Sequence, residues 1–328
     1  MAASYDSWPT LLRTGFARRR DYSIKPFAGH IMKQVILITG ASTGIGALSA
    51  RALAGAGHTV YASMRDTQGR NAPRVQELRD YATAHGADLR ALELDVLSQA
   101  SADAAIAAIL AGQGRLDVVI HNAGGLVTGP MEAFSPEEIG HVFDTNVIGA
   151  QRVNKAALPA MREQGSGLLL WISSTTTRGG FPPFMGPYTA AKAAMDSVAV
   201  TMSYELTRFG IETSIVTPGA FTRGTAHFPN AGKPADRATS AAYARYDGLM
   251  DQVGGRLTAL TPVDADPQAV ADEIVRVVGL PAGQRPFRTV IDFIGDGARE
   301  VSEVAERVRI DFARRIGIDD LLSIPAPA

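Results

Sequence analysis

The chain has 328 residues, of which 46% are hydrophobic and 20% charged, so it can bury a substantial core and is not a disordered chain. Its 32 basic and 33 acidic residues leave a net charge of −1, which provides no bulk field for nucleic acid. It has no cysteine, which excludes disulfides, thiolate nucleophiles and cysteine–zinc sites, and no apolar run reaches the ~18 residues of a membrane span. We expect a cytoplasmic protein with no nucleic-acid or membrane partner.

The first 31 residues differ from the rest of the chain. Residues 1–31 show no sustained helical or strand period, and they lack the apolar stretch of a secretory signal. We expect either a disordered extension or a natural start at Met32, because Met32-Lys33-Gln34 leads directly into the first strand pattern. A transit peptide is a third interpretation, although Asp6 and Asp21 are unusual in that class.

From Val35 onward, short apolar runs alternate with stretches of helical period. The pattern predicts strands at 35–39, 58–63, 90–94, 116–121, 168–173, 212–217 and 289–294. It predicts helices at 45–55, 71–85, 102–110, 136–164 (interrupted near Asn146 and Pro159), 188–209, 267–279 and 297–315. This alternation favours βαβ units. We therefore predict one Rossmann-type α/β domain over 32–328, a doubly wound, seven-stranded parallel sheet with helices on both faces.

One long segment interrupts this alternation. Residues 221–266, rich in glycine, proline and alanine, follow the sixth strand. Ligands of doubly wound sheets bind beyond the carboxyl ends of the strands, where inserted segments often cover them. We predict that this segment is a substrate lid within the single domain.

A glycine-rich turn joins the first strand to its helix. Glycines let the backbone approach a pyrophosphate, and the helix N-terminus offers N–H groups and a positive dipole end. The segment Thr39–Gly46 resembles the T-G-x-x-x-G-x-G cofactor signature of the short-chain dehydrogenase/reductase family. This resemblance implies that a nicotinamide dinucleotide is bound by Thr39, Gly40, Ser42, Thr43, Gly44, Ile45 and Gly46.

The end of the second strand bears on the choice of cofactor. A dinucleotide-binding fold reads the adenosine ribose about 20 residues past the glycines, with an acid for NAD and a basic residue for NADP. The strand ends in Met64-Arg65-Asp66, and Arg65 is similar to the 2′-phosphate-binding arginine of NADP-preferring family members. We expect NADP(H) to be preferred, while Asp66 keeps NAD(H) open.

Three further strand ends carry motifs of the same family. Asp95-Val96 resembles the adenine-side motif, and Asn122-Ala123-Gly124 matches the N-A-G motif along the cofactor. Pro218-Gly219 resembles the P-G motif beside the nicotinamide. Thr222, or alternatively Thr225, would hydrogen-bond the carboxamide of the nicotinamide.

The candidate catalytic residues include Tyr188 and Lys192, which share one face of a predicted helix as a Y-x-x-x-K pair. A free phenol has a pKa of about 10, and we expect the ammonium of Lys192 to lower that of Tyr188 towards working pH. The resemblance makes Tyr188 the general acid/base, and Lys192 also a ligand of the nicotinamide ribose. It implies that Ser174 holds the reacting oxygen, with Thr175 as the alternative, and that Asn146 supports a proton relay.

The motifs span residues 39–225 and imply an oxidoreductase that interconverts a secondary alcohol and a ketone or aldehyde by hydride transfer. Two alternatives stay open: an NAD-dependent member of the same family, and a non-catalytic NADP-sensing regulator. The end of the second strand is similar to hydroxysteroid and retinol dehydrogenases, and with Phe181, Phe184 and Phe221 it favours a bulky apolar substrate.

Two further expectations concern metals and assembly. His121 and His141 belong to no HExxH motif or acid–histidine cluster, so we expect structural or surface roles and no metal site. The helices at 136–164 and 188–209 correspond to those that pair subunits in the family, which implies a homodimer or homotetramer.

Overall fold

The computed structural model describes residues 32–246 and 248–324, and the expectations for residues 1–31 lie outside these ranges. The described strands form one sheet in the order β3-β2-β1-β4-β5-β6-β7, and every adjacent pair is parallel. The strands are β1 (Val35–Ile38), β2 (Thr59–Met64), β3 (Leu89–Glu93), β4 (Val118–His121), β5 (Gly167–Ile172), β6 (Ile211–Pro218) and β7 (Arg288–Ile291). This order confirms the predicted doubly wound, seven-stranded α/β fold.

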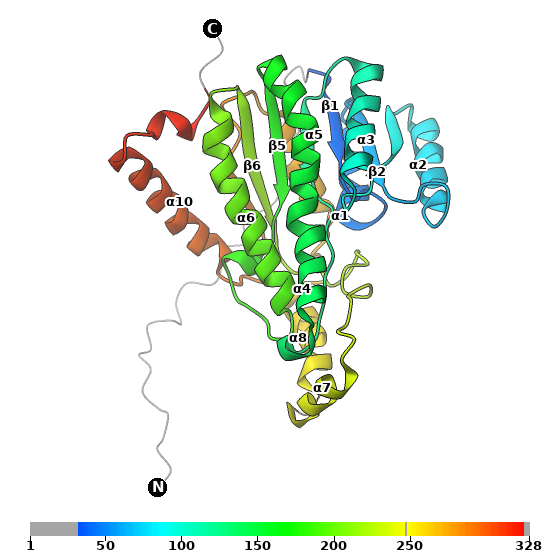
Figure 1. Cartoon of the computed structure of the whole chain (residues 1–328), viewed down its shortest axis with the longest axis vertical. Coiled ribbons are helices and arrows are strands. Elements are labelled where there is room, and N and C mark those ends of the chain that lie inside the picture. Colours follow the sequence, from blue (N-terminus) through cyan, green and yellow to red (C-terminus); the bar gives the residue numbers. More distant parts are fainter. Residues whose placement is uncertain (1–31, 247, 325–328) are drawn as a thin grey trace. The chain divides into compact units, whose positions relative to one another are not determined.

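Helices cover both faces of the sheet (Figure 1). One face packs against α1 (Gly44–Gly55), α2 (Ala72–His85) and α9 (Gln268–Gly279). The other packs against α3 (Gln99–Gln113), α5 (Gly149–Gln164) and α6 (Gly186–Thr207). The remaining helices are α4 (Pro136–Phe143), α7 (Arg237–Ala242), α8 (Leu249–Leu260) and α10 (Ala298–Arg315). None of the described helices is long and apolar enough to span a membrane.

The strands are continuous apolar runs because both of their faces are buried. In β1, Ile36 and Ile38 pack into the core on the α1 side, while Val35 and Leu37 pack into the core on the α3 side. Successive side chains of a strand point to opposite faces, so a run of four apolar residues supplies both cores. The carboxyl ends of these strands then meet at one edge of the sheet.

Some element boundaries differ from the predictions for physical reasons. Helix α3 begins earlier than expected because the Ser98 side chain caps it, accepting a hydrogen bond from the backbone N–H of Ser101. Pro159 does not interrupt α5, which runs through it. The expected break near Asn146 is present as a π-helical turn, η3 (Asp144–Ile148), between α4 and α5. Strand β7 ends early because Asp292 accepts hydrogen bonds from the N–H groups of the following turn.

The segment between β6 and α9 forms the predicted insertion. It carries α7, the short helix η5 (Tyr243–Tyr246) and α8. Its first part is tied to the loop after β4 by a bridge between Val127 and Gly232. Figure 1 shows α7 and α8 beside the end of α4, at the edge where the strands end. The insertion therefore lies where it could cover a ligand.

Candidate active site

A cavity of about 1460 Å³ runs along the carboxyl ends of the central strands. Single small-molecule pockets measure roughly 300–1,000 Å³, so this cavity has room for more than one ligand. Among the cofactor and catalytic residues predicted from the sequence, all line it except Thr39 and Thr222. The motif residues, spread from β1 to β6, are therefore brought together at one site.

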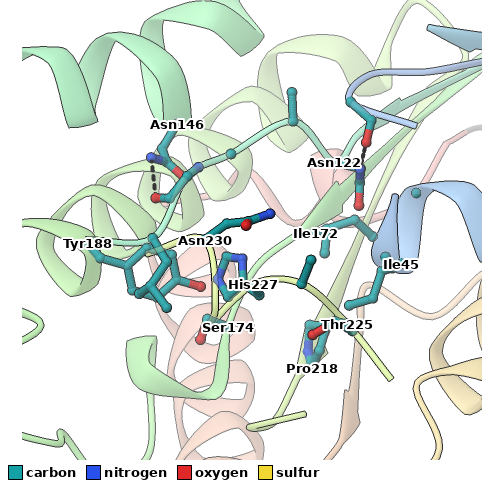
Figure 2. Close-up of a pocket in the computed structure, with 18 of the residues that line it drawn as sticks. Ile45, Asn122, Asn146, Ile172, Ser174, Tyr188, Pro218, Thr225, His227 and Asn230 are labelled. Carbon is teal, nitrogen blue, oxygen red and sulfur yellow. Dashed lines mark hydrogen bonds between the residues drawn. The ribbon is translucent and has the colours of Figure 1, made fainter. Parts of the chain in front are cut away.

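The glycine turn fits closely against β4. A Cβ on Gly40, whose φ is +66°, would lie 2.8 Å from the Cα of Ala123, and a Cβ on Gly46 would lie 2.4 Å from Nδ2 of Asn122. That Nδ2 donates hydrogen bonds to the carbonyl oxygens of Thr39 and Gly40, each at 2.9 Å, as Figure 2 shows in part. The turn therefore has no space for side chains at these two positions.

Thr39 shapes this turn without lining the cavity. Its Oγ1 accepts hydrogen bonds from the backbone N–H groups of Asn122 (3.1 Å) and Ala123 (3.0 Å). The N-terminus of α1 has no side-chain cap at Thr43 and no acidic residue in its first turn. Its backbone N–H groups and positive dipole end are therefore available to an anion such as a pyrophosphate.

The loop after β2 is held in one conformation. Glu93 accepts hydrogen bonds from the N–H groups of Asp66 and Thr67, each at 2.7 Å. Burial raises the pKa of the Glu93 carboxyl, but these two bonds and a third from the Thr67 hydroxyl outweigh it and hold the pKa below its usual value. Asp66 (φ +54°) turns its carboxylate into its own loop, where it accepts the N–H of Arg70 at 2.8 Å.

Arginines gather at this end of the cavity. Arg65, Arg70 and Arg74 line it, whereas Asp66 does not. Arg74 is paired with Glu77 at 2.7 Å, but the guanidinium groups of Arg65 and Arg70 form no hydrogen bond or ion pair with any described residue. Sequence reasoning identified Arg65 and missed Arg70, because no motif marks a residue inside the loop.

Tyr188 and Lys192 lie on α6 with 6% and 5% of their surfaces exposed. Burial raises the pKa of Tyr188 to about 12, and a hydrogen bond with Ser174 opposes this shift. Burial also lowers the pKa of Lys192 to about 8, and its Nζ donates to the carbonyl oxygen of Ile172 at 2.9 Å. The expected lowering of the Tyr188 pKa by the ammonium is therefore not found, because desolvation of the phenolate dominates.

The two hydroxyl candidates, Ser174 and Thr175, both line the cavity. The side chain of Ser174 opposes the rise in the pKa of Tyr188, whereas the side chain of Thr175 opposes a rise in the pKa of Asp296. Thr176, which the sequence analysis did not single out, donates to Oγ of Ser174 from its hydroxyl (3.0 Å) and its backbone N–H (3.3 Å). Ser174 also caps the short helix η4 (Thr175–Thr177), because its side chain accepts the backbone N–H of Thr176.

Asn146 sits in the π-helical turn η3, a type of irregularity that often occurs at functional sites. Its Nδ2 donates to the carbonyl oxygens of Val142 (2.9 Å) and Gly125 (3.2 Å), the second of which belongs to the loop after β4. A Cβ on Gly124 would lie 2.6 Å from Oδ1 of Asn146 and 3.5 Å from Nζ of Lys192. The side chains of Asn146 and Lys192 therefore both lie close to Gly124. A proton relay from Lys192 to Asn146 would need such proximity.

The insertion after β6 contributes a residue that the motifs do not mark. His227 stacks edge-on against Tyr188, with ring centroids 5.6 Å apart and planes at 65°. Desolvation by the surrounding protein lowers the pKa of His227 to about 4, and the charge of Lys192 lowers it further, although His227 is an exposed residue. Figure 2 shows His227 and Asn230 beside Tyr188 and Ser174. No motif or period in the lid sequence could have placed either residue here.

Thr222 and Thr225, the two candidates for binding the nicotinamide carboxamide, have different surroundings. Thr225 lines the cavity and donates to the carbonyl oxygen of Phe221 at 3.2 Å. Oγ1 of Thr222 is buried and has no hydrogen-bond partner among the described residues. An unpartnered buried hydroxyl is unusual and fits a group whose partner is a ligand, but Thr222 does not line the cavity. Its role stays a prediction.

His121 and His141, for which structural or surface roles were expected, occupy different positions. His121 is buried, its Nε2 is 2.7 Å from Oδ1 of Asn154, and its ring packs on Trp171. Burial lowers its pKa to about 4. His141 lines the outer part of the cavity. No group of three or more metal-binding side chains occurs among the residues that the structure describes.

Comparisons with known proteins agree with this geometry. The model of the short chain dehydrogenase family matches residues 34–233. The chain is 35% identical to 3-ketodihydrosphingosine reductase of Bacteroides thetaiotaomicron over 58% of this chain and 65% of the relative. It is 36% identical to 17-beta-hydroxysteroid dehydrogenase type 1 of Mus musculus over 57% of this chain and 54% of the relative. It thus spans less than two thirds of each of these two relatives.

A solved structure resembles the fold over most of its length. Actinorhodin polyketide ketoreductase, in a structure with NADPH, superimposes with a TM-score of 0.65 at 28% identity. The match covers 81% of this chain and 97% of the ketoreductase.

Proposed function

The chain belongs to the short-chain dehydrogenase family, and we propose that it is an oxidoreductase that interconverts a secondary alcohol and a ketone or aldehyde with NADP(H). The observation that carries this proposal is that Ser174 and Tyr188 lie side by side inside the cavity that the glycine turn also lines. A phenol and a serine hydroxyl side by side can hold one substrate oxygen and exchange a proton with it.

The protonation state of Tyr188 suits a proton donor. Thr176 is hydrogen-bonded to Oγ of Ser174 through its hydroxyl and its backbone N–H, which holds the serine hydroxyl beside Tyr188. With a pKa of about 12, the phenol is fully protonated at neutral pH, as an acid for carbonyl reduction must be.

The remaining site residues bind the cofactor or carry protons. The nicotinamide cofactor supplies or accepts a hydride when it is bound. We propose that Lys192 anchors the cofactor ribose and that Asn146 connects Lys192 to solvent for proton return. We also propose that the α1 N-terminus holds the pyrophosphate, with Asp95, Val96, Asn122, Ala123, Gly124, Pro218, Gly219 and Thr225 or Thr222 along the rest of the cofactor.

A preference for NADP(H) rests on the loop after β2. Arg65 and Arg70 line the cavity there with unpartnered guanidinium groups, which suit a 2′-phosphate. The carboxylate of Asp66 accepts a hydrogen bond from the backbone N–H of Arg70, and Asp66 does not line the cavity. It is therefore badly placed to bind a ribose hydroxyl. The NADPH in the ketoreductase structure is consistent with this assignment.

An apolar substrate suits the outer part of the cavity. Its wall there is lined by Leu126, Val127, Met185, Phe228, Leu257 and Leu260. The names of the two relatives describe a ketodihydrosphingosine reductase and a hydroxysteroid dehydrogenase. We therefore propose a bulky apolar alcohol or ketone as the substrate class.

One experiment tests the function against the regulator alternative. NADPH and NADH are titrated into the protein by cofactor fluorescence, and a panel of apolar ketones and aldehydes is then screened for NADPH oxidation. We expect tighter binding of NADPH than of NADH, and oxidation with at least one ketone. Binding without turnover of any panel member would favour an NADP-sensing regulator, and failure to bind either dinucleotide would refute both.

A further inference from the structure

Asp196 is a buried carboxylate to which the proposed mechanism gives no role. It lies on α6 one turn after Lys192 and two turns after Tyr188, so the three residues are close to one face of the helix. Its side chain is 3% exposed, and Asp196 does not line the cavity. Burying a carboxylate is costly unless it is paired and hydrogen-bonded, so the partners of Asp196 indicate what it holds in place.

Four hydrogen bonds reach the two oxygens of this carboxylate. Oδ1 accepts one from Arg178 at 3.0 Å and one from Arg288, on β7, at 2.8 Å. Oδ2 accepts one from the hydroxyl of Ser173 at 2.8 Å and a second one from Arg288 at 2.6 Å. Burial raises the pKa of Asp196, but Arg288, Ser173 and the charge of Arg178 outweigh it and hold the pKa below its usual value. A carboxylate has about four acceptor positions, so all of them are used.

Two of these partners lie on either side of the segment that contains Ser174. Ser173 directly precedes Ser174, and Arg178 directly follows the short helix η4, which Ser174 caps. Both are hydrogen-bonded to Asp196, which is on the same helix as Tyr188. The carboxylate therefore connects both ends of this segment to the helix that carries the phenol.

Arg288 fixes the carboxylate from the side of the sheet. Its side chain is 8% exposed, binds both oxygens of Asp196, and also donates to the hydroxyl of Thr217, on β6, at 3.2 Å. A guanidinium that binds a carboxylate through two N–H groups fixes its orientation as well as its position. Asp196 is therefore a rigid point of attachment for the segment that contains Ser174.

We propose that Asp196 is a positioning residue that, through Ser173 and Arg178, holds the hydroxyl of Ser174 where it can bind the reacting oxygen beside Tyr188. This role rests on the proposed function, because it requires that Ser174 binds a substrate oxygen. A shift of about 1 Å at a reacting group can lower turnover by about 100-fold. Loss of one connection should therefore lower turnover and leave the affinity for NADPH unchanged, since none of these connections belongs to the cofactor-binding motifs.

The test removes one connection at a time and keeps the buried pair of Asp196 and Arg288 intact, because an unpaired buried charge strongly destabilises a fold. The variants are Arg178→Gln and Ser173→Ala. The matched control is Arg208→Gln, at an arginine at the end of α6 that is 73% exposed and paired with an aspartate outside the cavity. NADPH-binding sites are counted by fluorescence titration, and ketone turnover is expressed per site.

We expect each of the two variants to lose about 5- to 20-fold in turnover per site, with a Kd for NADPH within about threefold of the wild type. Arg208→Gln should match the wild type in both. Fewer NADPH-binding sites with an unchanged turnover per site would show that these bonds only stabilise the fold, and this result would overturn the positioning role. Wild-type turnover per site in both variants, or an equal loss in Arg208→Gln, would overturn it as well. A wild-type protein that binds NADPH and turns over no ketone would overturn the proposed function and the positioning role with it.

Discussion

Tyr188 and Lys192 lie one turn apart on α6, and burial moves their pKa values in opposite directions, to about 12 for the phenol and about 8 for the ammonium. Both shifts favour the neutral form, since desolvation penalises either charge. At neutral pH the phenol therefore holds its proton. This state suits protonation of a carbonyl oxygen, whereas alcohol oxidation requires the much rarer phenolate.

The first prediction concerns the pH dependence of the two directions. Carbonyl reduction uses protonated Tyr188, so kcat should be level from about pH 6 to 7 and fall above about 8, where Lys192 loses its charge. Alcohol oxidation should instead rise by about tenfold per pH unit below pH 8, as the phenolate fraction grows. His227, with a pKa of about 4, titrates below this window. A reduction rate that rises with pH, or a level oxidation rate, would contradict the assignment.

The second prediction concerns His227, which covers one edge of the Tyr188 ring. Replacing it by alanine should admit water and lower the pKa of Tyr188, shifting the oxidation pH profile downward by about one unit. His227→Phe keeps a ring in place and serves as the matched control, with a profile like that of the wild type. Measured oxidation profiles that are the same for wild type and His227→Ala would show that the imidazole does not shield the phenol.

The third prediction concerns cofactor choice. Arg65→Ala removes a guanidinium proposed to bind the 2′-phosphate, and it should weaken NADPH binding by roughly 10- to 100-fold while leaving the Kd for NADH unchanged. Arg79→Ala, at an exposed arginine on α2, is the control and should change neither constant. Equal weakening of both dinucleotides by Arg65→Ala would indicate a structural role, and no weakening would remove Arg65 from the site.

The fourth prediction concerns acid stability. His121 has a pKa of about 4 in the folded chain against 6.5 ordinarily, so between these values the unfolded chain binds a proton that the folded chain does not. His121 therefore does not change the free energy of unfolding above about pH 6.5. As the pH falls from there to 4, it lowers the free energy of unfolding by about 3 kcal/mol. Urea unfolding across this range should show a shallower loss for His121→Gln than for the wild type. The exposed control, His85→Gln, should follow the wild-type curve.

The fold and the cofactor-side motifs could be predicted because each leaves a recognisable pattern in the sequence. The apolar run of β1 specifies a strand buried on both faces, and Gly40 and Gly46 are required by the close approach of Ala123 and Asn122. Their spacing along the chain is enough to recognise them.

Other features depend on contacts that spacing does not encode. The different neighbours of Ser174 and Thr175, which are Tyr188 and Asp296 respectively, follow from the tertiary fold around η4. His227 reaches Tyr188 only because the segment after β6 folds back towards α6. The direction of the Tyr188 pKa shift follows from burial, and the sequence shows only that a lysine is one helical turn away.

The central claim is that Tyr188 is the proton donor of a hydride-transfer enzyme. The most direct test is Tyr188→Phe, which removes the phenol oxygen and keeps the ring, measured in parallel for ketone turnover and for NADPH affinity. We predict a loss of turnover of roughly 10²- to 10⁴-fold with an NADPH Kd within about threefold of the wild type. A variant that keeps more than about a tenth of the wild-type turnover would contradict the claim.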